Sequence, residues 1–355
     1  MAQEIAAFVP RGRLLSYLEA IMRVYNLHGR RDNIYKARIK ILVNALGIEE
    51  FRRQVEAEWM TLDKPLIDLP AAELERIAAY FKPLILRNGP VKDTTVETRR
   101  RSDSAFDRWL RLNVLPHRVP GQAIVNISLK EPGKFPGDAS SAQMEAVADL
   151  ADEFAQAEIR VTYQQNLVLP NVAVRDLGAV YDGLVAANLA TANTELITDI
   201  IACPGLDYCN LANARSIGIA QEIAKRFAAP EKAEAIGPLR LNISGCINAC
   251  GHHHAGNIGI LGVDKRGTEH YQVTLGGSPK DDAEVGDIVG PSFTAEALPG
   301  AIEAIVETYL RRRTDQSETF VTAYCRLGKA PFREAIYGPD AGRRASHVSE
   351  ETTDV

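Results

Sequence analysis

The amino-acid sequence predicts an α+β fold, because helical and strand patterns fall in different parts of the chain. Apolar residues recur at helical spacing through residues 10–58. Residues 123–129 alternate between apolar and polar side chains, as a half-buried strand does. From residue 120 to residue 190 the pattern runs strand, helix, strand, strand, helix. We therefore expect a helical N-terminal segment followed by mixed α/β structure.

The first 118 residues are expected to form a helical connector and a linker. In the connector, residues 1–60, Gly29 and Gly47 mark the expected ends of helices. Residues 61–118 are interrupted by Pro65, Pro70, Pro83 and Pro90, and we predict them to be a linker that packs on a domain without forming one. A single helix is expected within it, at residues 71–81.

Residues 119–198 are predicted to form a ferredoxin-like α/β domain, because their order of elements is most of a split βαβ unit. The expected strands are residues 123–129, 158–163 and 166–170, and the expected helices are residues 142–154 and 174–187.

Residues 199–312 are expected to form a second α/β domain, which holds most of the cysteines. We predict strands at 197–202, 239–243, 257–263 and 271–275, and helices at 209–227 and 294–312. Residues 313–355 are treated as a C-terminal extension. Its end is polar and rich in small residues, so we expect the end to be disordered.

Four of the five cysteines lie within 48 residues, as C-x5-C and C-x3-C pairs. Cys203, Cys209, Cys246 and Cys250 are soft thiolate ligands that suit an iron–sulfur cluster or zinc. The wider spacing fits a structural zinc site poorly. A zinc-stabilised binding module, a cluster-only electron-transfer protein and four merely buried thiols remain as alternatives. Cys325 stands apart and is expected to be an ordinary core or surface thiol.

The cysteine motifs, Cys203-Pro-Gly-Leu-Asp-Tyr-Cys209 and Asn242-Ile-Ser-Gly-Cys246-Ile-Asn-Ala-Cys250-Gly, resemble those of the nitrite and sulfite reductase hemoproteins. Two further stretches are similar to this family. Residues 160–167, Arg-Val-Thr-Tyr-Gln-Gln-Asn-Leu, resemble the strand before the cluster motif. Residues 30–40, followed by residues 46–51, resemble the helical connector.

The resemblance implies a 4Fe–4S cluster held by all four cysteines and a siroheme whose iron shares the sulfur of Cys250. It also implies that Asn248, Gln165 and Asn166 contact the cofactors. For Gln165 and Asn166, hydrogen bonding to the backbone is the alternative. His252, His253 and His254 cannot all point one way on regular structure, and their role stays open between cofactor contact and proton supply.

The implied reaction is the six-electron reduction of sulfite to sulfide or of nitrite to ammonia, with ferredoxin or a flavoprotein as electron donor. The sequence departs from the family pattern at Ile247, where proline is commoner. By the same resemblance, the chain is expected to begin partway through the family's length. We therefore expect a longer enzyme, of which this is the C-terminal part, or a second subunit that completes the site.

The composition limits the other partners that we expect. A net charge of −5 argues mildly against nucleic acid. No run of about 18 apolar residues is present, so no membrane span is expected. The first residues lack a secretory pattern and thiolate ligands favour a reducing compartment, so a cytoplasmic location is expected.

Overall fold

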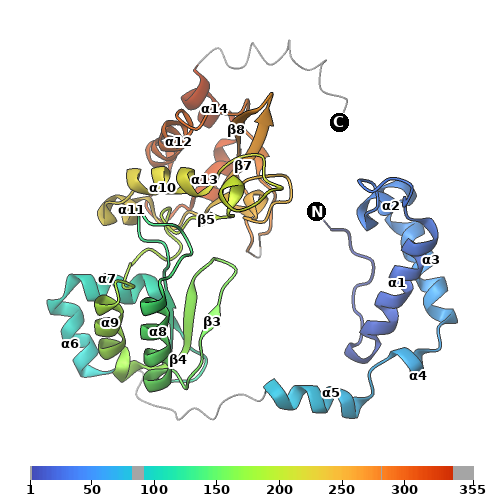
Figure 1. Cartoon of the computed structure of the whole chain (residues 1–355), viewed down its shortest axis with the longest axis horizontal. Helices are drawn as coiled ribbons and strands as arrows, with labels where there is room; N and C mark the ends of the chain where they lie inside the picture. The colour runs from blue at the N-terminus through green and yellow to red at the C-terminus, as the bar shows by residue number, and fades with distance from the viewer. Residues whose placement is uncertain (1, 82–91, 281, 339–355) are drawn as a thin grey trace. The chain divides into compact units, whose positions relative to one another are not determined.

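The computed structural model describes residues 2–81, 92–280 and 282–338 (Figure 1). The chain divides into two compact units, residues 1–85 and residues 86–355, which are described separately. Among the described residues, none of the helices combines the length and the apolar character that crossing a membrane requires. The α+β class expected from the sequence is confirmed.

The first unit is helical, as predicted for its connector. Its longer helices are α1 (Leu14–His28), α2 (Ile39–Leu46) and α3 (Ile48–Thr61), followed by the shorter α4 (Lys64–Ile67) and α5 (Ala71–Ala78). Gly29 and Gly47 cap the ends of α1 and α2, as expected. The small core of this unit is made by apolar side chains at helical spacing, among them Tyr17, Val24, Phe51 and Val55.

The second unit begins with an antiparallel sheet of order β1-β2-β4-β3. Its strands are β1 (Val114–Pro116), β2 (Gln122–Ile127), β3 (Arg160–Val161) and β4 (Leu167–Ala173). Helices α8 (Ser141–Phe154) and α9 (Leu177–Ala186) pack with the sheet around a shared apolar core. The predicted order strand, helix, strand, strand, helix is therefore confirmed, although β3 is only two residues long.

The sequence-based linker, residues 61–118, ends earlier than predicted. Helices α6 (Thr94–Ser102) and α7 (Ser104–Asn113) belong to the second unit, as does strand β1. Phe106 and Trp109 of α7 are fully buried in the core of the antiparallel sheet. Residues 94–116 therefore help to form this domain, because their amphipathic pattern supplies part of its core.

The second sheet has the order β5-β6-β7-β8-β9. Its strands are β5 (Ile201–Ala202), β6 (Leu241–Ser244), β7 (Ile258–Lys265), β8 (Thr268–Leu275) and β9 (Asp287–Ile288). Strands β5, β6 and β7 run parallel, whereas β7 with β8 forms the predicted hairpin. Among the described strands, β5 lies at the edge of this sheet.

Five helices complete this part of the unit: α10 (Ile217–Arg226), α11 (Pro230–Ile236), α12 (Leu298–Arg312), α13 (Phe320–Leu327) and α14 (Ala330–Tyr337). Figure 1 shows them, in yellow to red, beside β5, β7 and β8. Phe320 and Phe332 are fully buried in the same core as β6 and β7. The predicted boundary at residue 312 therefore cuts through a folded domain, because the next two helices complete its core. The disorder expected at the C-terminal end falls on residues 339–355, outside the described residues.

The helix predicted from Cys209 begins later, at Ile217. The backbone of residues 205–214 makes its hydrogen bonds to a neighbouring loop and within its own turns, so it forms a short 3-10 turn at Gly205–Asp207 and no α-helix. Gly205 lies in the left-handed region, at φ +59°, and a Cβ there would lie 2.5 Å from Ser216 Oγ. The tight turn at Gly205 thus depends on glycine.

Candidate functional site

The four cysteines lie on two loops at one edge of the second sheet. The first cysteine loop, residues 203–216, follows β5 directly and begins with Cys203. The second cysteine loop, residues 245–257, follows β6 and has Cys246 as its second residue. Since β5 and β6 are parallel neighbours, their carboxyl ends meet at the same edge. Ligand sites of open α/β sheets commonly form at such edges. Because each cysteine pair follows one of these two parallel strands, both pairs lie at the same edge of the sheet.

The two cysteine loops contact each other through the backbone around Gly245. The N–H of Gly245 donates to Cys203 Sγ at 3.0 Å. The carbonyl of Gly245 accepts hydrogen bonds from the N–H groups of Asn213, at 2.8 Å, and Ala214, at 3.1 Å. A Cβ on Gly245 would lie 2.7 Å from the Ala214 carbonyl oxygen, so the close approach requires glycine.

Burial differs among the four thiols. Cys203 and Cys246 are buried, Cys209 is half-buried and Cys250 is exposed. Within the ranges that the structure describes, no three His, Cys, Asp or Glu side chains are close enough together to hold one metal ion. The structure therefore brings the two loops together without gathering the four sulfurs into a ligand set.

The chemistry of these loops nevertheless fits an iron–sulfur group. Four thiols are available from two loops in contact, and a backbone N–H already donates to one of the sulfurs. Hydrogen bonds of this kind are what stabilise and tune iron–sulfur clusters in proteins.

Two polar side chains of β6 hold the turn that follows Cys250. The side-chain amide of Asn242 donates to the carbonyl oxygens of Gly251, at 3.0 Å, and His252, at 3.3 Å. Ser244 Oγ accepts a hydrogen bond from the N–H of Gly251 at 3.1 Å. Sequence reasoning missed both residues. The signal was present in the alternation Leu241-Asn-Ile-Ser244, where the polar residues share one face of a buried strand.

The three consecutive histidines diverge, as the sequence implied. His252 and His254 are exposed, whereas His253 is buried and lies beside His254, with ring centroids 4.1 Å apart. Within the described part of the chain, Nδ1 of His253 has no hydrogen-bond partner. Burial, with a smaller contribution from His254, lowers the pKa of His253 to about 4. His253 is therefore neutral near pH 7.

Gln165 and Asn166 form hydrogen bonds to protein groups. The side-chain amide of Gln165 bonds to the backbone of Ala202, the residue before Cys203. Asn166, which is 2 % exposed, accepts from the N–H of Leu129 and donates to Asp199. Of the two roles left open by the sequence, this geometry favours hydrogen bonding within the protein. Asn248 lies on the second cysteine loop and is exposed.

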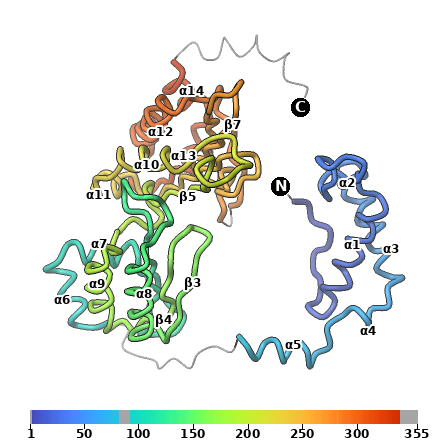
Figure 2. The backbone as a smooth tube through the Cα atoms, in the orientation of Figure 1, coloured from blue at the N-terminus to red at the C-terminus, as the bar shows by residue number. Residues whose placement is uncertain are grey.

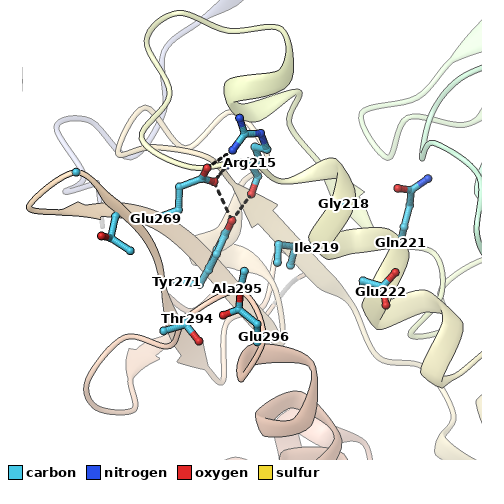
Figure 3. A pocket seen from close by; sticks show the side chains of 12 residues that line it. Arg215, Gly218, Ile219, Gln221, Glu222, Glu269, Tyr271, Thr294, Ala295 and Glu296 are labelled. Carbon is cyan, nitrogen blue, oxygen red and sulfur yellow. Dashed lines mark hydrogen bonds and ion pairs between the residues drawn. The ribbon is translucent and has the colours of Figure 1, made fainter.

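A hollow of about 720 Å³ lies beside the end of the first cysteine loop (Figure 3). At its wall Arg215 forms an ion pair with Glu269 of β8, and Tyr271 donates to the Arg215 carbonyl oxygen at 2.9 Å. Burial raises the pKa of Tyr271, so its hydroxyl remains a donor. None of the predicted site residues lines this hollow. The contacts of Arg215 with Glu269 and Tyr271 at its wall attach the end of the first cysteine loop to β8.

The chain is similar in sequence to known nitrite and sulfite reductases. It is 28 % identical over 323 residues to the chloroplastic ferredoxin–nitrite reductase of Zea mays, covering 87 % of this chain and 49 % of that protein. It is 29 % identical over 323 residues to sulfite reductase [ferredoxin] 2 of Mycolicibacterium paratuberculosis, covering 88 % of this chain and 51 % of that one. The chain thus spans about half the length of the curated relatives that it matches.

The structure of the Mycobacterium tuberculosis NirA protein is similar to this one, with a TM-score of 0.65 and 26 % identity. The similarity covers 93 % of this chain and 55 % of that chain. The model of the nitrite/sulfite reductase ferredoxin-like half domain matches residues 132–187. The model of the nitrite and sulphite reductase 4Fe–4S domain matches residues 1–61 and 195–344, more than half of the chain. The chain therefore belongs to the nitrite and sulphite reductase 4Fe–4S domain family, whose description names the cluster predicted from the cysteines.

Proposed function

We propose that this chain is the cluster- and siroheme-binding part of an enzyme that reduces sulfite to sulfide or nitrite to ammonia with six electrons. The observation that carries the proposal is the meeting of the two cysteine loops at the carboxyl ends of β5 and β6. The family to which the chain belongs is described as a 4Fe–4S domain, which supports the binding of a cluster by these cysteines.

In this proposal Cys203, Cys209, Cys246 and Cys250 would hold the cluster, and Cys250 would also help to hold the siroheme. The bound cofactors would supply the electron transfer and the activation of the substrate. The chain's own contribution is positional. Gly245 donates to the sulfur of Cys203, and Asn242 with Ser244 fixes the turn after Cys250.

Asn248 is the candidate in this chain for contact with a sulfur or a cofactor carboxylate, because it lies between Cys246 and Cys250 and is exposed. An amide can donate to either group. The names of the relatives include ferredoxin, which supports ferredoxin as the electron donor. We place the protein in the cytoplasm, where thiolates stay reduced.

The proposal is tested by anaerobic reconstitution of the chain with iron, sulfide and siroheme. Iron, sulfide and zinc analysis, together with the absorption spectrum, distinguishes the alternatives. We expect about four iron atoms and four sulfides per chain, from the cluster formula, together with siroheme absorption. Cluster absorption without siroheme would instead indicate an electron-transfer protein, and stoichiometric zinc without iron would indicate a zinc-stabilised module.

Serine variants assign the ligands. Replacing Cys203, Cys209, Cys246 or Cys250 by serine is expected to lower the iron content strongly. Cys325→Ser is the matched control, because Cys325 is an exposed cysteine on α13 and belongs to neither cysteine loop. Equal iron content in Cys250→Ser, Cys325→Ser and the unchanged chain would contradict the assignment.

A further inference from the structure

The strand that leads to Cys203 has one unpaired edge. The N–H of Cys203 donates to the Ile243 carbonyl at 3.1 Å, toward β6. In an extended strand the preceding residue, Ala202, therefore directs its N–H and C=O to the opposite side. Among the described residues no strand pairs with that side, because β5 is at the edge of the sheet. Ala202 is only 4 % exposed, so water cannot readily satisfy these two groups.

The side chain of Gln165 makes the two hydrogen bonds to Ala202 that a neighbouring strand would otherwise make. Its Oε1 accepts from the N–H of Ala202 at 3.1 Å, and its Nε2 donates to the Ala202 carbonyl oxygen at 2.7 Å. One primary amide thus satisfies both orphaned backbone groups. Figure 2 traces the β3–β4 hairpin in light green. Gln165 lies in the turn between these two strands, and its side chain reaches Ala202 of β5.

The hairpin tip is itself held in place by buried polar contacts. Gln165 lies in the left-handed region, at φ +61°, a conformation that non-glycine residues adopt rarely. Its neighbour Asn166 donates to Asp199 at 3.0 Å, and Asp199 is paired with the buried Lys130. Because these contacts fix the backbone of the tip, the Gln165 side chain is a rigid support for Ala202.

We propose that Gln165 is a positioning residue for Cys203. By holding Ala202 it fixes the Cys203 sulfur against the N–H of Gly245, which lies 3.0 Å away. Hydrogen bonds to cluster sulfurs stabilise the reduced, more negative state and so raise the reduction potential. This inference rests on the proposed function for the cluster. Its first test, hydrogen exchange at Ala202, does not require a bound cluster.

The first test uses the chain without cofactor and compares Gln165→Met with Gln164→Met. Gln164 is the matched control. It is a half-buried glutamine of the same turn, and its amide donates to the Glu195 side chain at 2.8 Å, without contacting Ala202. We expect hydrogen exchange in the peptide containing Ala202 and Cys203 to quicken about tenfold or more in Gln165→Met, the scale of one or two lost hydrogen bonds. Gln164→Met should exchange like the unchanged chain.

The second test measures the midpoint potential of the reconstituted cluster by a redox titration followed by electron paramagnetic resonance. We expect a more negative potential in Gln165→Met and an unchanged one in Gln164→Met. Gln165→Glu keeps the acceptor for the Ala202 N–H and loses the donor, so its rate of hydrogen exchange at Ala202 should fall between those of Gln165→Met and the unchanged chain. It also serves as the test variant if Gln165→Met does not fold.

The outcomes separate the two proposals. If the unchanged chain binds no cluster, the proposed function fails, while the exchange measurement still reports on the support of Ala202. Faster exchange with an unaltered potential would show a purely structural residue and overturn the positioning role. If Gln165→Met exchanged hydrogen at Ala202 as slowly as the unchanged chain, Gln165 would not support Ala202, and the inference would be overturned.

Discussion

The ammonium nitrogen of Lys130 lies 2.9 Å from a carboxylate oxygen of Asp199, and their side chains are only 1 % and 4 % exposed. Lys130 follows β2 of the antiparallel sheet, whereas Asp199 precedes β5 and the first cysteine. Burial lowers the pKa of Lys130, and the nearby carboxylate of Asp199 opposes that shift. This ion pair therefore links the ferredoxin-like part of the unit to the strand that carries Cys203.

Removing one partner of this pair should be costly. In Asp199→Leu the ammonium of Lys130 is left buried without a counter-charge, and we expect a loss of about 3–5 kcal/mol in the free energy of unfolding. The double variant Lys130→Met with Asp199→Leu should recover part of that loss, because no buried charge remains. Urea denaturation of the chain without cofactor measures both.

Glu222→Gln, which breaks an exposed pair with Lys225, is the control and should change stability by less than about 0.5 kcal/mol. A double variant no more stable than Asp199→Leu would contradict the explanation.

Gly251 should not tolerate any side chain. A Cβ there would lie 1.9 Å from the Ile243 carbonyl oxygen, which is backbone and cannot move aside without disturbing β6. We expect Gly251→Ala to cost about 2 kcal/mol or more in unfolding free energy, as overpacking does, and to lower iron incorporation at the neighbouring Cys250.

The matched control is Gly300→Ala in α12, where nothing lies within 4 Å of the added Cβ. Alanine is the better helix former, so this variant should be as stable as the unchanged chain or gain up to about 1 kcal/mol. Thermal unfolding followed by circular dichroism compares the two. Similar effects of both substitutions would refute the role assigned to the close approach at Gly251.

His253 should make stability depend on pH in acid. Its pKa is about 4 in the folded chain, against an ordinary 6.5. Between these values the unfolded chain binds more protons, so the free energy of unfolding falls as pH is lowered from about 6.5 to about 4. The full effect is at most about 3 kcal/mol, at 1.36 kcal/mol per unit of pKa.

The measurement is the difference in unfolding free energy between the unchanged chain and His253→Phe across this pH range. We expect the variant to lose less stability as the pH falls. Parallel pH profiles for the chain and His253→Phe would rule out this contribution.

The C-terminal helices should be essential for stability. Phe332 of α14 is fully buried against Phe320 and Tyr324 of α13, with ring centroids 5.7 Å apart in both pairs. Phe332→Ala is expected to cost about 3–5 kcal/mol, because it leaves a cavity in the main core. Phe135→Ala, at a phenylalanine that is 46 % exposed, should cost far less, and urea denaturation would show whether the two differ.

Local patterns predicted much of the fold correctly. The helical connector, the hairpin β7–β8 and the order of elements in the ferredoxin-like part follow from the spacing of apolar residues and from turn residues. The motifs around Cys203 and Cys246 also indicate the family on their own, because ligand type and spacing are properties of the sequence itself. The start of α10 was predicted less well, since the N–H groups of Asn213 and Ala214 bond to Gly245 and residues 205–214 do not form an α-helix.

The sequence by itself determined the four thiols, their spacing and the α+β class. Only the tertiary structure decided how these cysteines are supported. Gln165 contacts Ala202 across 37 residues, and Lys130 pairs with Asp199 across 69. Such contacts form only where the two sheets meet. The spacing of apolar and polar residues along the chain does not show which side-chain amide will bond to an edge strand, or which buried charges will pair. Side chains that satisfy buried backbone groups are therefore apparent only once the strands are placed beside one another.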